Sequence, residues 1–145
     1  KNTKAHQLAM PVVYYSPITF LYWYDLPNVY KGEKELDFWK YCPTVWDESK
    51  ALQGEIGEYI VQARRSGNDW FVGAMNGLQA RDITLNTAEF LQKGKKYRVE
   101  IYNDVPAWNT RTTVSTVVQT IKAGKILKLH LQPSGGAALR FSLLK

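Results

Sequence analysis

The first part of the chain is rich in apolar residues that suit helices. Residues 5–15 contain good helix formers, Asn2 or Thr3 can cap them, and Pro11 is expected to kink the helix. The next segment, residues 17–24, begins with a proline and is expected to form a second helical stretch. The sequence therefore predicts two consecutive helices before residue 25.

These two helices lack a polar side that could face water. Between residues 8 and 24 only Ser16 and Thr19 are plainly polar, so the segment has no solvent-facing stripe. A membrane span needs about 20 apolar residues, whereas this run has 17 and contains two prolines. A signal peptide is excluded because the basic start and small-residue cleavage site are absent. We therefore expect no membrane span, and we expect these helices to lie inside a folded protein.

A short amphipathic helix is expected over residues 32–41, and the hydrophobic period then changes from helical to alternating. Turn residues separate the alternating segments every 8 to 12 residues or so. The recognisable strands cover residues 58–64, 69–75, 81–85, 97–102, 111–120, 126–131 and 138–143. About eight short strands of this kind predict an antiparallel β-sandwich.

The chain thus divides into a helical part, residues 1–42, and an all-β part, residues 43–145. One sandwich would cover only one side of helices that are apolar all round. We therefore expect residues 1–42 to be the truncated end of a larger domain, with cover by a second copy of the chain as the alternative.

Charge and cysteine content narrow the function classes. The net charge of +6 arises in residues 96–145, which hold eight Lys or Arg against two Asp or Glu, spaced singly along the chain. No basic run or basic helix face supports nucleic-acid binding, so we expect no nucleic-acid partner. The single cysteine, Cys42, excludes an internal disulfide and a cysteine-based zinc site.

No catalytic or metal-binding constellation is evident. His6 and His130 are the only histidines, and neither has a ligand partner at suitable spacing. The glycine-rich segment 134–136 is interpreted as a turn, because a strand rather than a helix follows it.

Four carboxylates were considered for glycosidic chemistry, which needs two of them across one bond. They are Asp47, Glu48, Glu55 and Glu58. Nothing in the sequence supplies an apolar pocket that would raise the pKa of one of them. Adjacent Asp47 and Glu48 would also point to opposite faces if they lay on a strand.

Three tryptophans could stack on sugars if they were exposed. Trp46 and Trp70 are expected in the core, whereas Trp108 lies in a loop segment and is the better candidate. The alternative function is therefore a carbohydrate-binding module that uses exposed aromatic residues such as Trp108.

Several short motifs follow one another along the chain. They are Ala5-His6-Gln7-Leu8-Ala9-Met10, Val12-Val13-Tyr14-Tyr15-Ser16-Pro17, Asp25, Pro27, Tyr30, Pro43-Thr44-Val45-Trp46-Asp47-Glu48, Gly54-Glu55-Ile56-Gly57-Glu58-Tyr59, Ala63-Arg64-Arg65 and Ser134-Gly135-Gly136-Ala137-Ala138. In this order and spacing they resemble the C-terminal end of glycoside hydrolase family 97, and the similarity extends over residues 5–144.

The resemblance implies a three-part parent enzyme: an N-terminal β-sandwich, a catalytic (β/α)8 barrel and a C-terminal β-sandwich associated with assembly. Residues 1–42 would then be the C-terminal helices of the barrel and residues 43–145 the last sandwich, which could form a homodimer. The parent would hydrolyse α-glucosidic or α-galactosidic bonds of an oligosaccharide with calcium near its catalytic carboxylates. A periplasmic or secreted location is implied as well.

No catalytic residue, metal ligand or cofactor is expected within this chain, because none of its carboxylates matches those of the family. Loops at the carboxyl ends of barrel strands line such an active site. Asn2, Thr3 and His6 would stand at the start of the last barrel helix, so they are candidates for the rim of the parent's substrate pocket.

Overall fold

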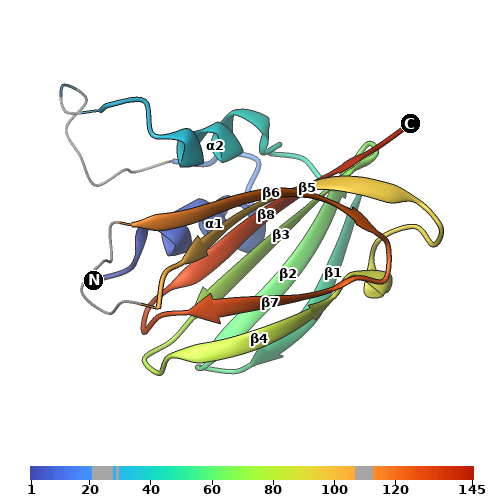
Figure 1. Ribbon diagram of the computed structural model, residues 1–145. Helices are drawn as coiled ribbons and strands as arrows, with labels where there is room; N and C mark the ends of the chain where they lie inside the picture. Colours follow the sequence, from blue (N-terminus) through green and yellow to red (C-terminus); the bar gives the residue numbers. More distant parts are fainter. Residues whose placement is uncertain (21–27, 29, 107–112) are drawn as a thin grey trace.

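The computed structural model describes residues 1–20, 28, 30–106 and 113–145. Three layers are visible in Figure 1: a six-stranded sheet, a two-stranded sheet across one face, and short helices across the other. The helical elements are α1 (Lys4–Val13), η2 (Lys34–Leu36), α2 (Asp37–Tyr41) and η3 (Thr87–Glu89). The strands are β1 (Glu48–Glu55), β2 (Tyr59–Ser66), β3 (Asp69–Asn76), β4 (Arg81–Asn86), β5 (Lys96–Asp104), β6 (Val114–Lys122), β7 (Ile126–Leu131) and β8 (Gly136–Leu143).

Every strand pair is antiparallel, so the predicted antiparallel β-sandwich is confirmed. The large sheet has the order β1-β2-β3-β8-β5-β6, and β4 pairs with β7 in the small sheet. The seven strands recognised in the sequence are present where they lie in the described residues; residues 111 and 112 of the strand predicted over 111–120 lie outside them, and β6 begins at Val114. The eighth is β1, which mixes charged residues with glycine and has no clear alternation.

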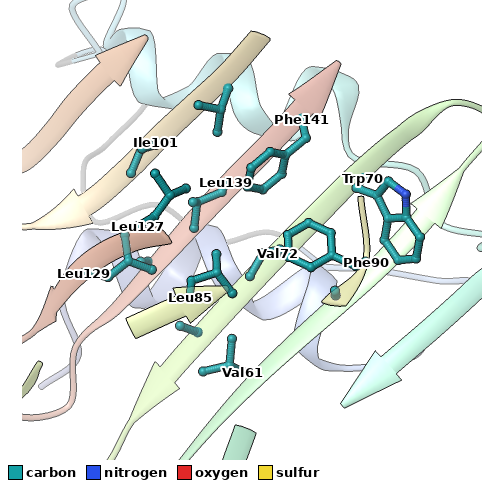
Figure 2. Close-up of a cluster of buried hydrophobic side chains, with 14 of the residues drawn as sticks. Val61, Trp70, Val72, Leu85, Phe90, Ile101, Leu127, Leu129, Leu139 and Phe141 are labelled. Carbon is teal, nitrogen blue, oxygen red and sulfur yellow. The ribbon is translucent and has the colours of Figure 1, made fainter. Parts of the chain in front are cut away.

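Alternation along the strands separates two cores on opposite faces of the large sheet. The inner core lies between the two sheets, where one face of β3, β5 and β8 meets the buried leucines of β7. Figure 2 shows its centre, in which Phe90 packs edge-on against Phe141 and tilts against Trp70. Period-two patterning therefore produces the sandwich as predicted.

The outer core lies between the large sheet and the helices. Leu8 and Val12 of α1 and Phe38 of α2 are fully buried against Phe71 and Tyr102 of the sheet. Because both of their faces are covered, the central strands β3 and β8 are buried along most of their length.

Small residues on the sheet let α1 approach closely. A Cβ added at Gly73 would lie 2.8 Å from the carbonyl oxygen of Ala9, and one at Gly136 would lie 2.8 Å from the Cα of His6. Both distances are shorter than packed atoms tolerate, so the backbone of α1 occupies the space where side chains would be.

The helix α1 is covered by this chain itself. None of its ten residues is exposed, and Lys4, Ala5, His6, Leu8, Ala9, Pro11 and Val12 are buried. The expectation that a sandwich would leave it mostly uncovered is therefore wrong for residues 4–13. It holds for the residues that follow, because Tyr14, Tyr15, Ile18 and Phe20 are exposed.

The second helix predicted for residues 17–24 does not form in residues 17–20, and residues 21–24 lie outside the described part. The Ser16 hydroxyl donates to the carbonyl of Ile18 at 2.5 Å and accepts from its amide at 3.2 Å. This local pairing competes with helical hydrogen bonds. The residue before a proline is also biased away from the helical conformation.

Candidate functional site

The residues predicted to face a substrate pocket lie where α1 joins the sandwich. Thr3 caps α1 by accepting a hydrogen bond from the backbone amide of His6, at 3.1 Å. The Nδ1 of His6 donates to the carbonyl oxygen of Gly135, 2.9 Å away, so this nitrogen carries the proton. Thr3 and His6 are both buried. Their contacts within the chain hold α1 in place, and a role for Asn2, Thr3 and His6 toward substrate stays a prediction.

Asp104 is the buried acid of this junction. Its Oδ2 accepts hydrogen bonds from the backbone amides of Gln132 and Gly136, at 2.9 and 2.7 Å. Burial raises the pKa of Asp104 above its ordinary value, although these amides and the Thr3 hydroxyl oppose that shift. Sequence reasoning missed Asp104, because its role depends on a turn 28 or more residues away.

The predicted turn at residues 134–136 is confirmed, and its glycines are required by packing. Ser134 has a positive φ of 54°. A Cβ at Gly135 would overlap the Oδ2 atom of Asp104, and one at Gly136 would strike the carbonyl of Ala74 at 2.5 Å. The turn therefore carries no phosphate site; it brings backbone amides to Asp104 and a carbonyl to His6.

Arg64 secures the other end of α1. Its Nε donates to the carbonyl of Val12 at 2.5 Å, and its Nη2 donates to that of Val13 at 3.2 Å. The same guanidinium donates to the Ser49 hydroxyl at 2.5 Å and lies over the ring of Tyr15. The last carbonyls of a helix have no partner within it and carry partial negative charge, which a buried arginine satisfies well.

The four candidate carboxylates lie at the surface, and three of them contact arginine side chains of the fold. Asp47 precedes β1, and both Asp47 and Glu48 contact Arg65, at 3.6 and 3.2 Å. Arg65 donates a hydrogen bond from Nε to the Glu48 carboxylate, and this bond lowers the pKa of Glu48 below its ordinary value. Glu58 pairs with Arg81 at 3.1 Å, and Glu55 is exposed at the end of β1. The partners of Asp47, Glu48 and Glu58 are thus arginines of strands β2 and β4.

His130 has a partner that its sequence neighbours did not indicate. Asp82 of β4 stands opposite His130 of β7 in the sheet register, and their side chains approach to 2.6 Å. Nowhere in the described residues do three or more His, Cys, Asp or Glu side chains gather as a metal site.

The tryptophans follow the prediction where they are described. Trp70 is buried in the inner core. Trp46 packs against Phe71 with ring centroids 5.4 Å apart. Trp108, the candidate for sugar stacking, lies outside the described residues.

An apolar surface remains beside α1. The segment of residues 14–20, termed here the apolar segment, exposes 70% of Ile18 and 92% of Phe20. Beneath it is a shallow hollow of about 260 Å³ whose lining includes Met10, Pro11 and Trp39. Surfaces of this kind usually contact another protein surface. None of the helices in the described residues has the length and apolar character needed to span a bilayer.

The comparisons with known proteins identify this architecture. Residues 45–142 match the family model described as "Glycosyl-hydrolase 97 C-terminal, oligomerisation". The chain belongs to glycoside hydrolase family 97. The match begins at Val45 and ends at Ser142, so it takes in strands β1 to β7 and nearly all of β8.

The relatives are much longer proteins. The chain is 41% identical, over 142 residues, to a retaining alpha-galactosidase of Bacteroides thetaiotaomicron, and the match covers 97% of this chain but 21% of that protein. It is 37% identical to a family 97 enzyme of a Pseudoalteromonas species solved with acarbose, at a TM-score of 0.88, covering 99% of this chain and 23% of that one. A beta-arabinopyranosidase structure matches at 29% identity and a TM-score of 0.76, covering 97% and 21%. The chain thus spans about a fifth of the length of these relatives.

Several residues of the family-like motifs lie at the contact between α1 and the sheet. His6 lies in α1, while Arg64, Gly135 and Gly136, which belong to other motifs quoted above, contact or abut this helix. In this family 97 chain the motifs therefore specify how the first helix is held on the sheet.

Arg64 offers a direct test of this junction. We expect Arg64→Met to lower the free energy of unfolding by about 1.5 to 3 kcal/mol, because hydrogen bonds from a charged group are lost and two buried carbonyls keep no partner. Urea unfolding of the 145-residue chain measures this. Arg65→Met is the matched control on the same strand; its partners are partly exposed carboxylates, and its loss is expected to cost about 0 to 1 kcal/mol. Equal effects of the two changes would contradict the role of Arg64.

His6 predicts a pH dependence of stability. Burial lowers the pKa of His6 below 6.5 in the folded chain. The unfolded chain therefore binds the proton more readily, and the stability that neutral His6 contributes is full above pH 6.5 and declines as the pH falls below it. Asp104, whose pKa is raised, acts with the opposite sign in acid.

The effect of His6 is isolated by comparison with His6→Asn, which keeps a donor near the position of Nδ1 but does not titrate. Urea unfolding at about pH 7.5 and about pH 5.5 should show that the free energy of unfolding falls more on acidification in the wild type than in the variant. Identical losses would show that His6 does not titrate as the junction requires.

Proposed function

We propose that this chain is the non-catalytic C-terminal part of a family 97 enzyme that hydrolyses α-galactosidic or α-glucosidic bonds. The observation that carries the proposal is the 41% identity to a retaining alpha-galactosidase, which extends over nearly this whole chain but only 21% of the relative. The α-glucosidic alternative draws on the related enzyme solved with acarbose and with panose. Catalysis would then be carried out by the remainder of the parent chain.

The proposal gives the sandwich a structural role toward the catalytic barrel. The apolar segment would pack on the barrel, because its side chains are the largest exposed apolar groups next to α1. The hollow beneath Phe20 would be closed by the same contact. Residues 1–42 would form the connection between barrel and sandwich, with α1 fixed on the sandwich side by His6 and Arg64.

Activity assays separate the catalytic part from this part. The 145-residue chain should not hydrolyse nitrophenyl α-galactoside or α-glucoside, whereas the longer parent chain should hydrolyse one of them. Clear turnover by the 145-residue chain, or none by the parent, would refute the assignment.

Calcium is proposed to bind in the remainder of the parent chain and not in these 145 residues, and adding EDTA to the parent tests this. Cell fractionation tests the proposed periplasmic or secreted location.

Phe20 tests the contact with the barrel. In the 145-residue chain this side chain is 92% exposed, so Phe20→Ser should change stability by less than about 0.5 kcal/mol. In the parent the same change should cost about 3 kcal/mol or more, because a large aromatic group would leave a buried contact. Thermal unfolding of both proteins measures the difference. Leu78→Ser, at an exposed loop position, is the control, and an equally small effect of Phe20→Ser in both proteins would exclude the contact.

A further inference from the structure

Strand β6 forms one edge of the large sheet. It pairs with β5 over nine consecutive residues, from Val114 opposite Asp104 to Lys122 opposite Lys96, with no irregularity in register. Figure 1 shows it as the outermost strand of the large sheet beyond β5. Among the described residues no element pairs with its other side, so every second residue presents backbone donors and acceptors to an open edge.

The side chains of β6 favour strand pairing. Residues 113–121 carry no charge, proline or glycine, and most are valine, threonine or isoleucine. Such β-branched residues have high strand propensity. This combination, on a long regular edge strand, is the pattern that joins another strand readily.

The layers that cover the large sheet leave both faces of β6 exposed at its middle. The register with β5 places Val117 on the inner face, opposite Ile101, and Val118 on the outer face, opposite Glu100. Val117 is 46% exposed and Val118 is 53% exposed. The small sheet has only two strands and the helices cover the centre of the large sheet, so neither layer reaches over the middle of β6.

The other strand edges in the described part of the chain are protected. At the opposite edge of the large sheet, β1 carries Glu48, Lys50 and Glu55 and has a register shift between Ala51 and Gln53. In the small sheet, β4 begins with a charged pair and β7 contains a lysine. Charges and bulges are the usual means of preventing edge-to-edge pairing. β6 has neither along its middle.

We propose that β6 is the oligomerisation edge, pairing antiparallel with β6 of a second copy of the chain across a two-fold axis. The proposal rests on the proposed function in one respect, because it takes this chain to be the C-terminal part of a longer family 97 enzyme. The family model that matches residues 45–142 gives oligomerisation as the role of this region. The pairing would join the two large sheets into one continuous sheet.

Charge supports a second copy as the occupant. With the two-fold axis at Val118, the centre of β6, antiparallel register places Lys122 opposite Val114 of the partner subunit. The two lysines then lie at opposite ends of the pair, and the uncharged middles face each other. Self-pairing therefore brings no like charges together, and it covers Val117 and Val118 at the centre of the contact.

The test is sedimentation velocity of the full-length protein that carries this chain. The wild type should be a dimer, and Val118→Lys should weaken dimerisation at least about tenfold, because two ammonium groups would face each other at the axis. Thr116→Lys, on the same face, gives a second disruption. Ile126→Lys is the matched control, since Ile126 is a β-branched strand residue with 47% exposure but lies on β7.

Charge reversal adds a positive readout. Val118→Glu alone should also be monomeric, and an equimolar mixture with Val118→Lys should restore dimers, because opposite charges would then meet at the axis. A monomeric wild type would overturn the proposal and would leave the barrel of the same chain as the occupant of this edge. Dimers that survive Val118→Lys, or that Ile126→Lys dissociates equally, would overturn it as well.

Hydrolytic activity is measured on the same samples. Dimerisation that depends on β6 in a protein without α-glycosidase activity would refute the proposed function and leave the edge assignment standing. Full activity in a monomeric wild type would refute the edge assignment and leave the proposed function standing.

Discussion

The close contact of α1 with the outer face of the large sheet is the constraint on which the rest of the structure depends. It requires the absence of side chains at Gly73 and Gly136, where the helix backbone takes their place. It also requires partners for both helix ends, which Thr3 and Arg64 provide. Since backbone polar groups cannot be buried without hydrogen bonds, these contacts must form together.

This constraint determines how the chain presents itself to other surfaces. With α1 held on the sheet, the helix ends at Val13 and most of the apolar segment that follows is exposed, while Tyr15 lies beside Arg64 of β2. The helices and the small sheet cover the centre of the large sheet and leave β6 open. The two exposed apolar regions therefore lie on different elements: one suits the parent's barrel and the other suits a second copy.

In the described part of this family 97 chain, several acids are bound to cations or to backbone amides of the fold. Glu48 and Glu58 pair with arginines at the surface, and Asp104 binds backbone amides that hold a turn. Acids in a glycosidase need a shared space for substrate between them. Here Glu48, Glu58 and Asp104 are bound to groups of the fold, and the proposal therefore assigns the chemistry of the enzyme to other residues of the parent.

The sequence by itself determined the sandwich, because alternation is a local property. In β7, for example, every second residue is a buried leucine, and this pattern can be read from the sequence whichever strand pairs with β7. It also determined the turn at residues 134–136 and limited the helix cap to Asn2 or Thr3, of which the structure uses Thr3. Only the tertiary structure decided that α1 is covered by the sandwich, that Asp104 meets the glycine turn and that Asp82 faces His130. The same holds for the open edge at β6. These features depend on which distant strands pair and how far each layer extends, and no local period carries that information.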